Sequence, residues 1–435
     1  MIEKIVEIKM EEKKKIQQER TGRSRQPEAR KKSKKMSYRK KIVMFQIGAI
    51  TLAIFLTLMI GAVMLTRIFV DENKSAETVN AKPATEGGTE AGDAKKGEAS
   101  GEKDPSSDGA ESTPAEEPTQ EPESVQPVES VQLTVSAVGD CTIGTDEQFD
   151  KSSNFDAFYI VKKDPAYFFQ NVKEILGGDD LTIINMEGTL TESTDRQEKT
   201  FAFKGDPKYT EILTAGSVEA ANLANNHSKD YGEQSYTDTI QYLENAGLTT
   251  FGYDRVAVKE IKGIKVGLVG IYVLADGMGR QQQVIDNIQA VKDQGAQVVI
   301  VSFHWGTEKS NYPDETQKAL AHTAVDSGAD LVLGHHPHVL QGIEKYKGKN
   351  IVYSLGNFCF GGNRNPADKD TMIFQQTFTF ENGALVQDDV TNIIPCSLSS
   401  VQQYNDYQPT PLEGEEAQRV QQKIQEFSSG LSAEQ

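Results

Sequence analysis

Residues 131–395 alternate short apolar runs with longer amphipathic stretches, a pattern typical of an α/β protein. The apolar runs predict buried strands at Gln132–Val138, Leu181–Asn185, Val218–Leu223, Lys265–Tyr272, Ala296–Phe303, Asp330–Leu333 and Asn350–Ser354. The amphipathic stretches predict helices at Pro165–Leu176, Glu233–Ala246, Gln281–Gln294 and Asp314–Asp326. Because strands joined through helices run parallel, we expect at least one mainly parallel sheet.

Glycines and a hairpin signal refine this picture. Gly247 and Gly328 follow two of the predicted helices and are expected to end them. Near the end of the body, Met372–Phe380 and Ala384–Ile394 flank Asn382–Gly383, which predicts an antiparallel pair. The sheets are therefore expected to be mixed.

The segment Ile42–Thr66 has no charged residue in 25 positions. As a helix it would be about 37 Å long, enough to cross a hydrocarbon layer of roughly 30 Å. Basic residues precede it at 39–41, and Arg67 alone follows. This asymmetry predicts a single-pass protein of the cell membrane, with a cytoplasmic N-terminus and an extracellular C-terminal domain. A cleaved signal peptide is the alternative, but the run is long and no A-x-A site follows it.

Charge and composition set apart the segments on either side of this anchor. Residues 1–41 form a basic cytoplasmic arm with 16 basic and 6 acidic residues, which sets the topology and could attract anionic lipid. Residues 67–130 read as a disordered acidic linker. Positions 71–130 lack Leu, Ile, Met and aromatic residues and carry 16 acidic against 5 basic residues, too few apolar groups to offset the entropy of ordering.

Residues 396–435 read as a polar tail with one helix. Five apolar residues recur there at helical spacing: Ala417, Val420, Ile424, Phe427 and Leu431. The domain proper is therefore expected at 131–395.

The net charge argues against a nucleic-acid partner. The chain has 46 Lys+Arg and 64 Asp+Glu, a net charge of −18, and residues from 42 onward alone carry −28. Such a body repels polyphosphates. Three cysteines exclude a disulfide-stapled fold, although Cys359 and Cys396 could pair outside the cytoplasm. Cys141 could be a soft metal ligand or a small buried thiol.

Polar residues with metal-binding chemistry follow six of the predicted strands. They lie at Asp140, Glu187, Asn225–His227, His304–Glu308, His335–His338 and Ser354–Asn357. These segments hold five of the six histidines, whereas His322 lies inside a predicted helix and is expected to be structural. Ligands of open α/β sheets bind beyond the carboxyl ends of the strands, so the six segments should converge. Imidazoles and carboxylates together predict a site for a divalent cation.

Four segments in this order resemble the CapA family of poly-γ-glutamate capsule synthesis proteins, within the calcineurin-like metallophosphatase superfamily. They are Leu223–Gly232 (LANNHSKDYG), His304–Glu308 (HWGTE), Gly334–Val339 (GHHPHV) and Tyr353–Phe358 (YSLGNF). The resemblance covers about residues 131–394. It implies a four-layer α/β/β/α metallophosphatase-like sandwich of mixed sheets.

The same resemblance implies one or two divalent ions (Mn, Zn, Fe or Mg). Its pattern assigns Asp140 and His338 to the first ion, and Asn226, His304 and His336 to the second. His227 would lie beside the substrate as an acid or charge stabiliser, and we predict it as a catalytic residue together with Asp140. The His-Pro-His spacing fits this reading, because residues i and i+2 of an extended loop lie on one side.

The sequence departs from the superfamily pattern at two positions. Thr142 stands where phosphatases of the superfamily carry a histidine, and Glu187 stands near the place of a bridging aspartate. We predict Glu187 as a substitute metal ligand with a longer reach. The first ion's position is expected to be the weaker one.

Six further side chains are predicted to bind substrate: Asn225, Lys204, Trp305, Glu308, His335 and Asn357. Among these, Trp305 is expected to form a pocket wall. Lys204, and Arg364 in a Gly/Asn-rich loop, could receive an anionic substrate or be ordinary surface charges.

Three functions fit these features. The first is an anchored extracytoplasmic factor for synthesis, export or attachment of an anionic surface polymer, by resemblance poly-γ-glutamate. Its expected partners are that polymer, membrane-bound polymer synthetase components and the lipid bilayer. The second is a metal-dependent hydrolase, either a phosphoesterase or a γ-glutamyl amidase. The third is a non-catalytic module that binds polymer.

Overall fold

The computed structural model describes residues 129–431, which belong to one compact unit. The predicted basic arm, the anchor at 42–66 and nearly all of the predicted linker lie outside the described residues. Within residues 129–431, no helix combines the length and the apolar character needed to span a membrane.

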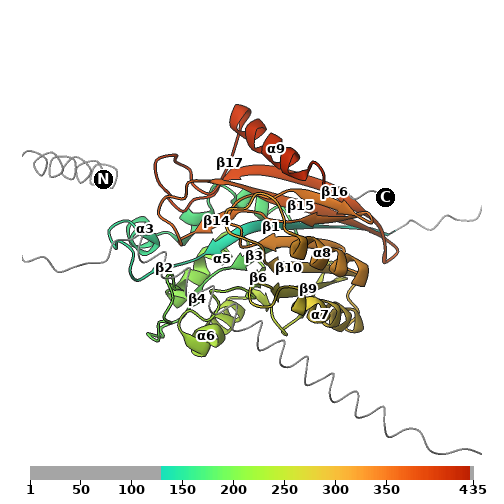
Figure 1. Ribbon diagram of the computed structural model, residues 1–435, viewed down its shortest axis with the longest axis horizontal. Coiled ribbons are helices and arrows are strands. Elements are labelled where there is room, and N and C mark those ends of the chain that lie inside the picture. The colour runs from blue at the N-terminus through green and yellow to red at the C-terminus, as the bar shows by residue number, and fades with distance from the viewer. Residues whose placement is uncertain (1–128, 432–435) are drawn as a thin grey trace, which may run out of the picture. The chain divides into compact units, whose positions relative to one another are not determined.

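The larger sheet has eight strands in the order β17-β16-β15-β1-β3-β6-β7, with β14 paired to β1. They are β1 (Ser130–Thr142), β3 (Leu181–Met186), β6 (Ala220–Asn222), β7 (Thr249–Phe251), β14 (Asn357–Phe360), β15 (Asp370–Glu381), β16 (Ala384–Ser397) and β17 (Thr410–Pro411). β1 runs parallel to β3 and β14 but antiparallel to β15. This sheet is mixed, as predicted, and Figure 1 shows β1 crossing its middle.

The second sheet has six strands in the order β12-β13-β11-β10-β9-β8. They are β8 (Ala257–Ile261), β9 (Ile264–Tyr272), β10 (Val298–His304), β11 (Leu331–His335), β12 (Ile343–Tyr346) and β13 (Lys349–Val352). The four inner strands are parallel, and the two edge strands are antiparallel to their neighbours. The inner strands are buried on both faces, which explains their nearly continuous apolar sequences.

A third, small sheet and ten helical segments complete the described part. The small sheet joins β2 (Thr145–Asp146), β5 (Phe203–Gly205) and β4 (Thr189–Leu190). The α-helices are α3 (Phe155–Lys162), α4 (Lys173–Leu176), α5 (Thr210–Ala215), α6 (Gly232–Asn245), α7 (Gln281–Asp293), α8 (Glu315–Ser327) and α9 (Gly414–Ser428). The 3₁₀ turns are η1 (Pro165–Phe169), η2 (Pro207–Tyr209) and η3 (Gly277–Arg280).

The two large sheets pack face to face. One hydrophobic cluster contains Val135 and Ile183 from the larger sheet together with Leu268 and Ile300 from the second sheet. Burial of these apolar side chains holds the sheets together, at about 25 cal/mol per Å² removed from water.

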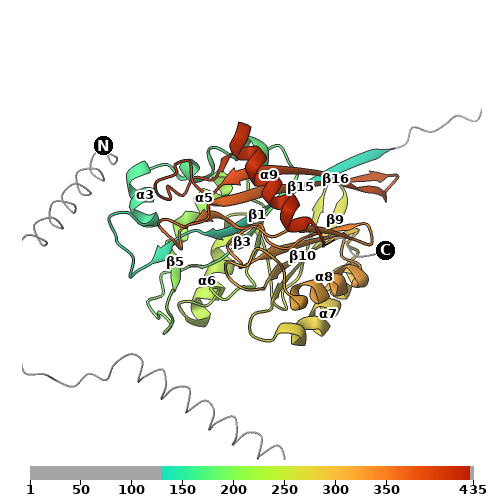
Figure 2. The same cartoon turned by 45° about the horizontal axis from the view of Figure 1, so that its top comes forward.

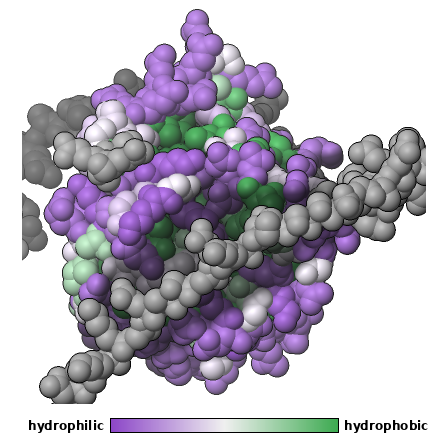
Figure 3. All heavy atoms as spheres, turned by 90° about the vertical axis from the view of Figure 1, so that its right-hand side faces the viewer, coloured by the Kyte–Doolittle hydropathy of each residue, from purple (hydrophilic) through white to green (hydrophobic). Residues whose placement is uncertain are grey.

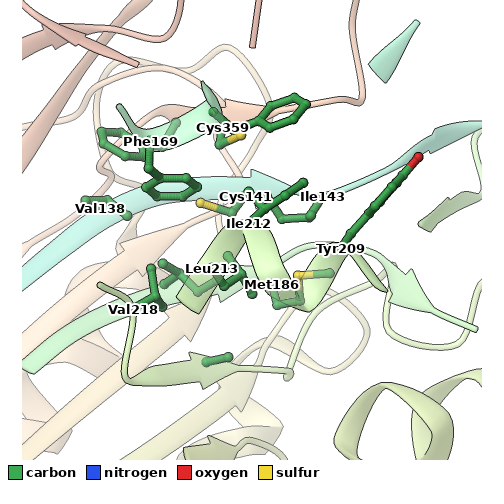
Figure 4. Close-up of a cluster of buried hydrophobic side chains, with 14 of the residues drawn as sticks. Val138, Cys141, Ile143, Phe169, Met186, Tyr209, Ile212, Leu213, Val218 and Cys359 are labelled. Carbon is green, nitrogen blue, oxygen red and sulfur yellow. The ribbon is translucent and has the colours of Figure 1, made fainter. Parts of the chain in front are cut away.

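Helices cover the outer faces of both sheets. A second cluster packs η1, α5 and α6 against the larger sheet, and Figure 4 shows part of it, with Phe169, Ile212 and Leu213 near Cys141 and Cys359. A third cluster packs α7 and α8, through Val284 and Leu320, against the second sheet. Figure 1 shows these two helices side by side.

All three cysteines are buried and free. Cys359 and Cys396 therefore form no disulfide in this structure. Cys141 lies in the hydrophobic cluster, its thiol 3.6 Å from the Gly139 carbonyl oxygen, which fits the buried-thiol reading. Burial raises the pKa of Cys396 to about 12, so this thiol is unreactive at neutral pH.

Most predicted elements are present, with one clear exception. The predicted helix Pro165–Leu176 is instead a 3₁₀ turn followed by the four-residue α4. The apolar residues whose spacing suggested a helix still face the core, because Phe168, Val172 and Leu176 are all buried. At the ends of α8, the predicted start and stop signals are formed: Asp314 makes a capping box, and Gly328 has a φ of 108°.

The predicted polar tail folds back onto the body. β16 runs through the predicted boundary at 395/396, and the predicted helix is confirmed as α9. Val420 and Ile424 of α9 join the cluster between the sheets, and Figure 2 shows α9 crossing in front of β15. On the face drawn in Figure 3, hydrophilic residues predominate, and hydrophobic ones show in patches between them.

Candidate metal centre

The carboxyl ends of strands from both sheets meet at one place. Asp140 at the end of β1 is in register with Asn185 of β3 and Asn357 of β14, and His304 of β10 is in register with His335 of β11. The amide nitrogen of Asn185 connects the two sheets: Nδ2 donates to Oδ1 of Asp140 at 2.8 Å and lies 3.2 Å from Nδ1 of His304. The predicted convergence of these strand ends is therefore observed.

Seven of the predicted site residues gather here, and we call them the strand-end cluster: Asp140, Glu187, Asn226, His227, His304, His336 and His338. Asp140 is fully buried and well supplied with partners. Its Oδ2 accepts from the backbone N–H of His336 at 3.1 Å and lies 3.2 Å from Nδ1 of His338. Burial would raise the pKa of Asp140, but His335 and His338 hold it well below its usual value.

Glu187 differs sharply from Asp140. It is fully buried, yet neither carboxylate oxygen accepts a hydrogen bond from the described residues. The Nε2 atoms of three imidazoles surround the same oxygen, Oε1: His338 at 3.6 Å, and His227 and His304 at 3.9 Å each. Burial raises the pKa of Glu187 to about 8, and the negative charge of Asp140 contributes to this rise. A buried carboxylate without a donor is costly unless a cation binds it.

His304 lies beside this carboxyl group and is in contact with Asn226. The amide oxygen of Asn226 lies 2.6 Å from Nε2 of His304. Burial and the neighbouring His336 keep the pKa of His304 well below its usual value, so its imidazole is neutral. A neutral imidazole and an amide oxygen can both donate a lone pair to a metal.

The loop after β11 holds two histidines in an unusual backbone conformation. His336 has a φ of 95° and His338 a φ of 57°, both in the left-handed region that non-glycine residues rarely adopt. Such backbone strain concentrates at functional sites. Burial lowers the pKa of His336 to about 4. Burial would also lower the pKa of His338, but Glu187 and Asp140 raise it to about 10.

The donor set fits a divalent cation. Ligand atoms of Glu187, His336 and His338 all lie within 4.8 Å of one another. Nδ1 of His336 is buried without a hydrogen-bond partner among the described residues, as are both oxygens of Glu187. A divalent cation would supply the positive charge that the proton on His338 otherwise provides, and would use these lone pairs.

The ring of His227 is positioned by Asp230, which contacts its Nδ1 atom. Its Nδ1 lies 2.7 Å from Oδ2 of Asp230, and Oδ1 of Asp230 accepts from Nζ of Lys199 at 2.7 Å. Nε2 of His227 therefore faces Glu187, as its 3.9 Å distance shows. Burial lowers the pKa of His227, against the opposing effect of Asp230. This pair fixes the ring so that a proton can be exchanged at Nε2.

The family described as "Bacterial capsule synthesis protein PGA_cap" matches residues 134–362, over half of the chain. The chain belongs to this family.

Two relatives found by sequence, both named CapA, agree with this assignment. The capsule biosynthesis protein CapA of Bacillus anthracis is 29% identical over 299 residues, which cover 62% of this chain and 70% of that protein. The PGA biosynthesis protein CapA of Bacillus subtilis (strain 168) is 30% identical over 254 residues, covering 52% of this chain and 63% of that protein. A crystal structure of a hypothetical protein from Thermus thermophilus aligns with 60% of this chain and 99% of that one, at 16% identity and a TM-score of 0.36.

A cleft opens beside the strand-end cluster of this PGA_cap member. It has a volume of about 410 Å³, and its lining includes His227, His338, Asn357 and Glu308. Two predicted substrate residues, Glu308 and Asn357, thus lie at the cleft. Oδ1 of Asn357 also lies 2.9 Å from Nδ1 of His338 and so positions that ring.

The other predicted substrate residues have different surroundings. Trp305 is fully buried, donates from Nε1 to the Tyr353 carbonyl at 2.9 Å and stacks on Phe303. It does not form the predicted pocket wall, because its indole packs in the hydrophobic cluster between the second sheet and its helices. Asn225 shapes the turn, since its Oδ1 accepts from the backbone N–H of His227.

Lys204 and His335 are also placed by their contacts. Nζ of Lys204 donates to the Ser193 carbonyl at 2.8 Å and lies over the Tyr231 ring, away from the cleft lining. His335 is buried, with Nδ1 3.4 Å from Oδ1 of Asp140, so it contacts the strand-end cluster through that carboxylate.

Three residues of this PGA_cap site were not predicted from the sequence. Asp230 and Asn185 stand within segments that were recognised, three residues after His227 and two before Glu187, so their positions carried a signal. The position of Lys199 gave no such signal in the sequence. His322 is structural as expected, with Nε2 2.9 Å from Oε1 of Glu344.

Proposed function

We propose that this chain acts outside the cell in the synthesis, export or attachment of a poly-γ-glutamate capsule, through the strand-end cluster. Its family and the names of its relatives support a role in capsule synthesis. The observation that carries the proposal is Glu187, a fully buried carboxylate without a donor among the described residues, surrounded by three imidazoles beside a cleft.

The architecture forms part of the same proposal. Two mixed sheets share one core, and helices cover their outer faces. This order supports the four-layer metallophosphatase-like sandwich that the sequence resemblance implies. The location is proposed from the sequence: an uncleaved anchor at 42–66, a cytoplasmic arm at 1–41, and a polymer synthetase in the same membrane as partner.

One or two divalent cations are proposed as cofactors. Glu187, His336 and His338 would hold one ion, with Asn226, His304 and Asp140 adjacent. When bound, such an ion supplies a Lewis acid that activates water and neutralises an anionic oxygen of the substrate.

The residues of the chain then have separate tasks. Asp140 holds the loop after β11 through the backbone of His336 and the ring of His338. Asp230 orients His227 so that its Nε2 can give or take a proton at the cleft. Lys199 neutralises Asp230, which keeps the ring from being held as a permanent cation.

The test uses a host that makes poly-γ-glutamate. The native gene is replaced by the His304→Ala or His336→Ala variant, and surface polymer is measured along with the amount of the protein. We expect polymer to fall to the level of a deletion strain. His322→Ala is the matched control, a histidine outside the cluster, and should leave polymer unchanged. Normal polymer in the His304→Ala and His336→Ala strains would refute the proposal.

A second candidate function is a metal-dependent hydrolase of γ-glutamyl amides or phosphoesters. The oriented His227–Asp230 pair favours it, because a module that only binds polymer has no need for a held proton carrier. The full chain with Mn²⁺ would be tested on γ-glutamyl peptides and on phosphodiesters. Turnover that is lost in His227→Gln supports this function, whereas binding without turnover favours the non-catalytic module.

A further inference from the structure

We propose that the cleft at the strand-end cluster continues into a second pocket that binds a neighbouring residue of an acidic γ-glutamyl chain. Arg364 receives a carboxylate there, and Phe201 contacts the chain's methylene groups. This inference rests on the proposed function and adds to it a subsite for an extended polymer.

The two cavities share a wall. The cleft has a volume of about 410 Å³, and the second pocket, of about 330 Å³, is lined by Phe149, Arg364 and others. Both are lined by Phe201, Gly362 and Asn363. A ligand that is long enough can therefore pass from His227 and His338 to Arg364 without leaving a lined surface.

An aromatic row leads from one cavity to the other. The Phe203 ring lies 4.4 Å from the His227 ring, centroid to centroid, and Phe201 stacks on Phe203 at 6.3 Å. Phe149 then meets Phe201 edge to face at 6.1 Å. Phe201 is 49% exposed although it belongs to this row, so its ring is available to an apolar part of a ligand.

Gly362 lies in the wall shared by the two cavities, where it has no side chain to fill the space. A Cβ atom at this position would lie 2.7 Å from Cζ of Phe360 and 3.0 Å from Cζ of Phe203. Any side chain here would push on both rings, which line the cleft. A glycine at this point thus leaves room between the cavities.

The second pocket is lined by one cation, Arg364, and one carboxylate, Asp150. Nη1 of Arg364 donates to Oγ of Ser153 at 2.9 Å and lies 3.6 Å from Oδ2 of Asp150, and its side chain is still 57% exposed. The guanidinium is thus oriented but open to solvent, and guanidinium groups suit carboxylates. In a chain of net charge −18, a polyanion needs such local cations.

The cleft, at the end next to the strand-end cluster, is lined by both positive and negative side chains. Lys309 and Glu308 both line the cleft, and Asp368 at its rim is paired with Lys423 at 2.7 Å. Each end has both a cation and a carboxylate, so the sign of the charge does not choose between them. We place the polymer carboxylate at Arg364 because its guanidinium is oriented by Ser153 and exposed, and we place the scissile or transferred amide at the strand-end cluster.

The exposed phenyl ring of Phe201 and the exposed guanidinium of Arg364 together indicate the class of ligand. Each residue of a γ-linked glutamate chain presents two methylene groups and one carboxylate, which match an exposed phenyl ring followed by a guanidinium. A small phosphoester would fill the cleft alone and gain nothing from the second pocket. The subsite therefore predicts that affinity rises with oligomer length.

The test measures binding of γ-linked glutamate oligomers, one short and one long, to the full chain in detergent with Mn²⁺. We expect the long oligomer to bind more tightly than the short one. Arg364→Gln and Phe201→Ala should each weaken the long oligomer by roughly three- to tenfold. Arg364→Gln should leave the short oligomer unchanged, whereas Phe201→Ala should weaken the short oligomer less than the long one, because Phe201 lines both cavities. Arg255→Gln is the matched control, an exposed arginine paired with Glu244 on another part of the surface.

Each outcome decides a different claim. If both oligomers bind equally, or if Arg364→Gln binds the long oligomer as well as the wild type does, the subsite is refuted while the proposed function stands. If neither oligomer binds and the His304→Ala strain keeps its polymer, both claims fail. Circular dichroism of each variant checks that the fold is retained, which is expected because both side chains are exposed.

Discussion

Two clusters of buried acidic side chains in this protein differ in their hydrogen-bond partners. In the strand-end cluster, Glu187 is fully buried and accepts no hydrogen bond from the described residues. Beneath α9, Asp370 is 9% exposed and accepts from Arg419 at 2.7 and 2.8 Å and from Lys423 at 2.8 Å. We call Asp368, Asp370, Arg419 and Lys423 the docking cluster.

This difference in hydrogen-bond partners indicates that one cluster has a structural role and the other a proposed functional one. The docking cluster is complete by itself, because each carboxylate meets cations from α9, and its role is to fasten that helix to the start of β15. The strand-end cluster brings together lone pairs without enough donors among the described residues, which is why we propose that it binds a cation. Buried carboxyl groups therefore have a structural role in the docking cluster and a proposed metal-binding role in the strand-end cluster.

The largest effect is expected for metal affinity at Glu187. Glu187→Gln keeps the shape but removes the charge, so the affinity for Mn²⁺ should fall by roughly a hundredfold. Isothermal titration of the full chain measures this. Asp370→Asn serves as the control and should bind Mn²⁺ as the wild type does.

The same variant also tests stability in the absence of metal. The free energy of unfolding with chelator should not decrease in Glu187→Gln, because burial raises the pKa of Glu187 to about 8 and the amide replaces a carboxyl group that is mostly uncharged at neutral pH. A decrease similar to that of a normal buried pair would show that Glu187 is structural.

The next effect is expected in the docking cluster. Asp370→Asn leaves Arg419 and Lys423 with weaker acceptors and should lower the free energy of unfolding by about 1–3 kcal/mol. Urea unfolding of the full chain measures this, with and without Mn²⁺. An equal loss of metal affinity would contradict the separation of the two clusters.

A smaller effect is expected at Asp230, which positions His227 without reaching the cleft. Asp230→Asn should lower turnover, or polymer yield in the cell, by roughly tenfold and shift the pH profile that His227 sets. Asp230→Glu should rescue part of the loss. A purely structural role would change stability and leave the pH profile as it was.

The smallest effect concerns pH. Burial would raise the pKa of Asp370, but Arg419 and Lys423 hold it below its usual value. A depressed pKa stabilises the fold above the ordinary aspartate value of about 4, and this contribution is lost as pH falls through the folded pKa. The stability difference between wild type and Asp370→Asn should thus be full at neutral pH and vanish in acid. A difference that stays constant across this range would disprove the ion pairing.

Much of the architecture could be predicted because it depends on local pattern. The buried parallel strands β9, β10 and β11 are continuous apolar runs, and the β15–β16 pair turns at Asn382 and Gly383, whose φ angles are 50° and 80°. The small strands β2, β4 and β5 were not predicted, because two or three residues carry no periodicity.

The site was predicted in outline for the same reason, since ligands meet at strand ends. What the sequence could not show is which partners each residue finds. Trp305 follows a ligand in the chain yet packs in the core, whereas Lys199 lies far from any motif yet reaches Asp230. Such contacts depend on side-chain directions after packing. The helix of the tail was predicted, but its ion pairs were not, because Asp370 and Arg419 are 49 residues apart.

The most direct measurement is anomalous X-ray scattering from crystals of the protein grown with Mn²⁺. The account predicts a peak among Glu187, His336 and His338, at bonding distance from an oxygen of Glu187. A map without a peak at this position, with Mn²⁺ bound elsewhere or not at all, would contradict it.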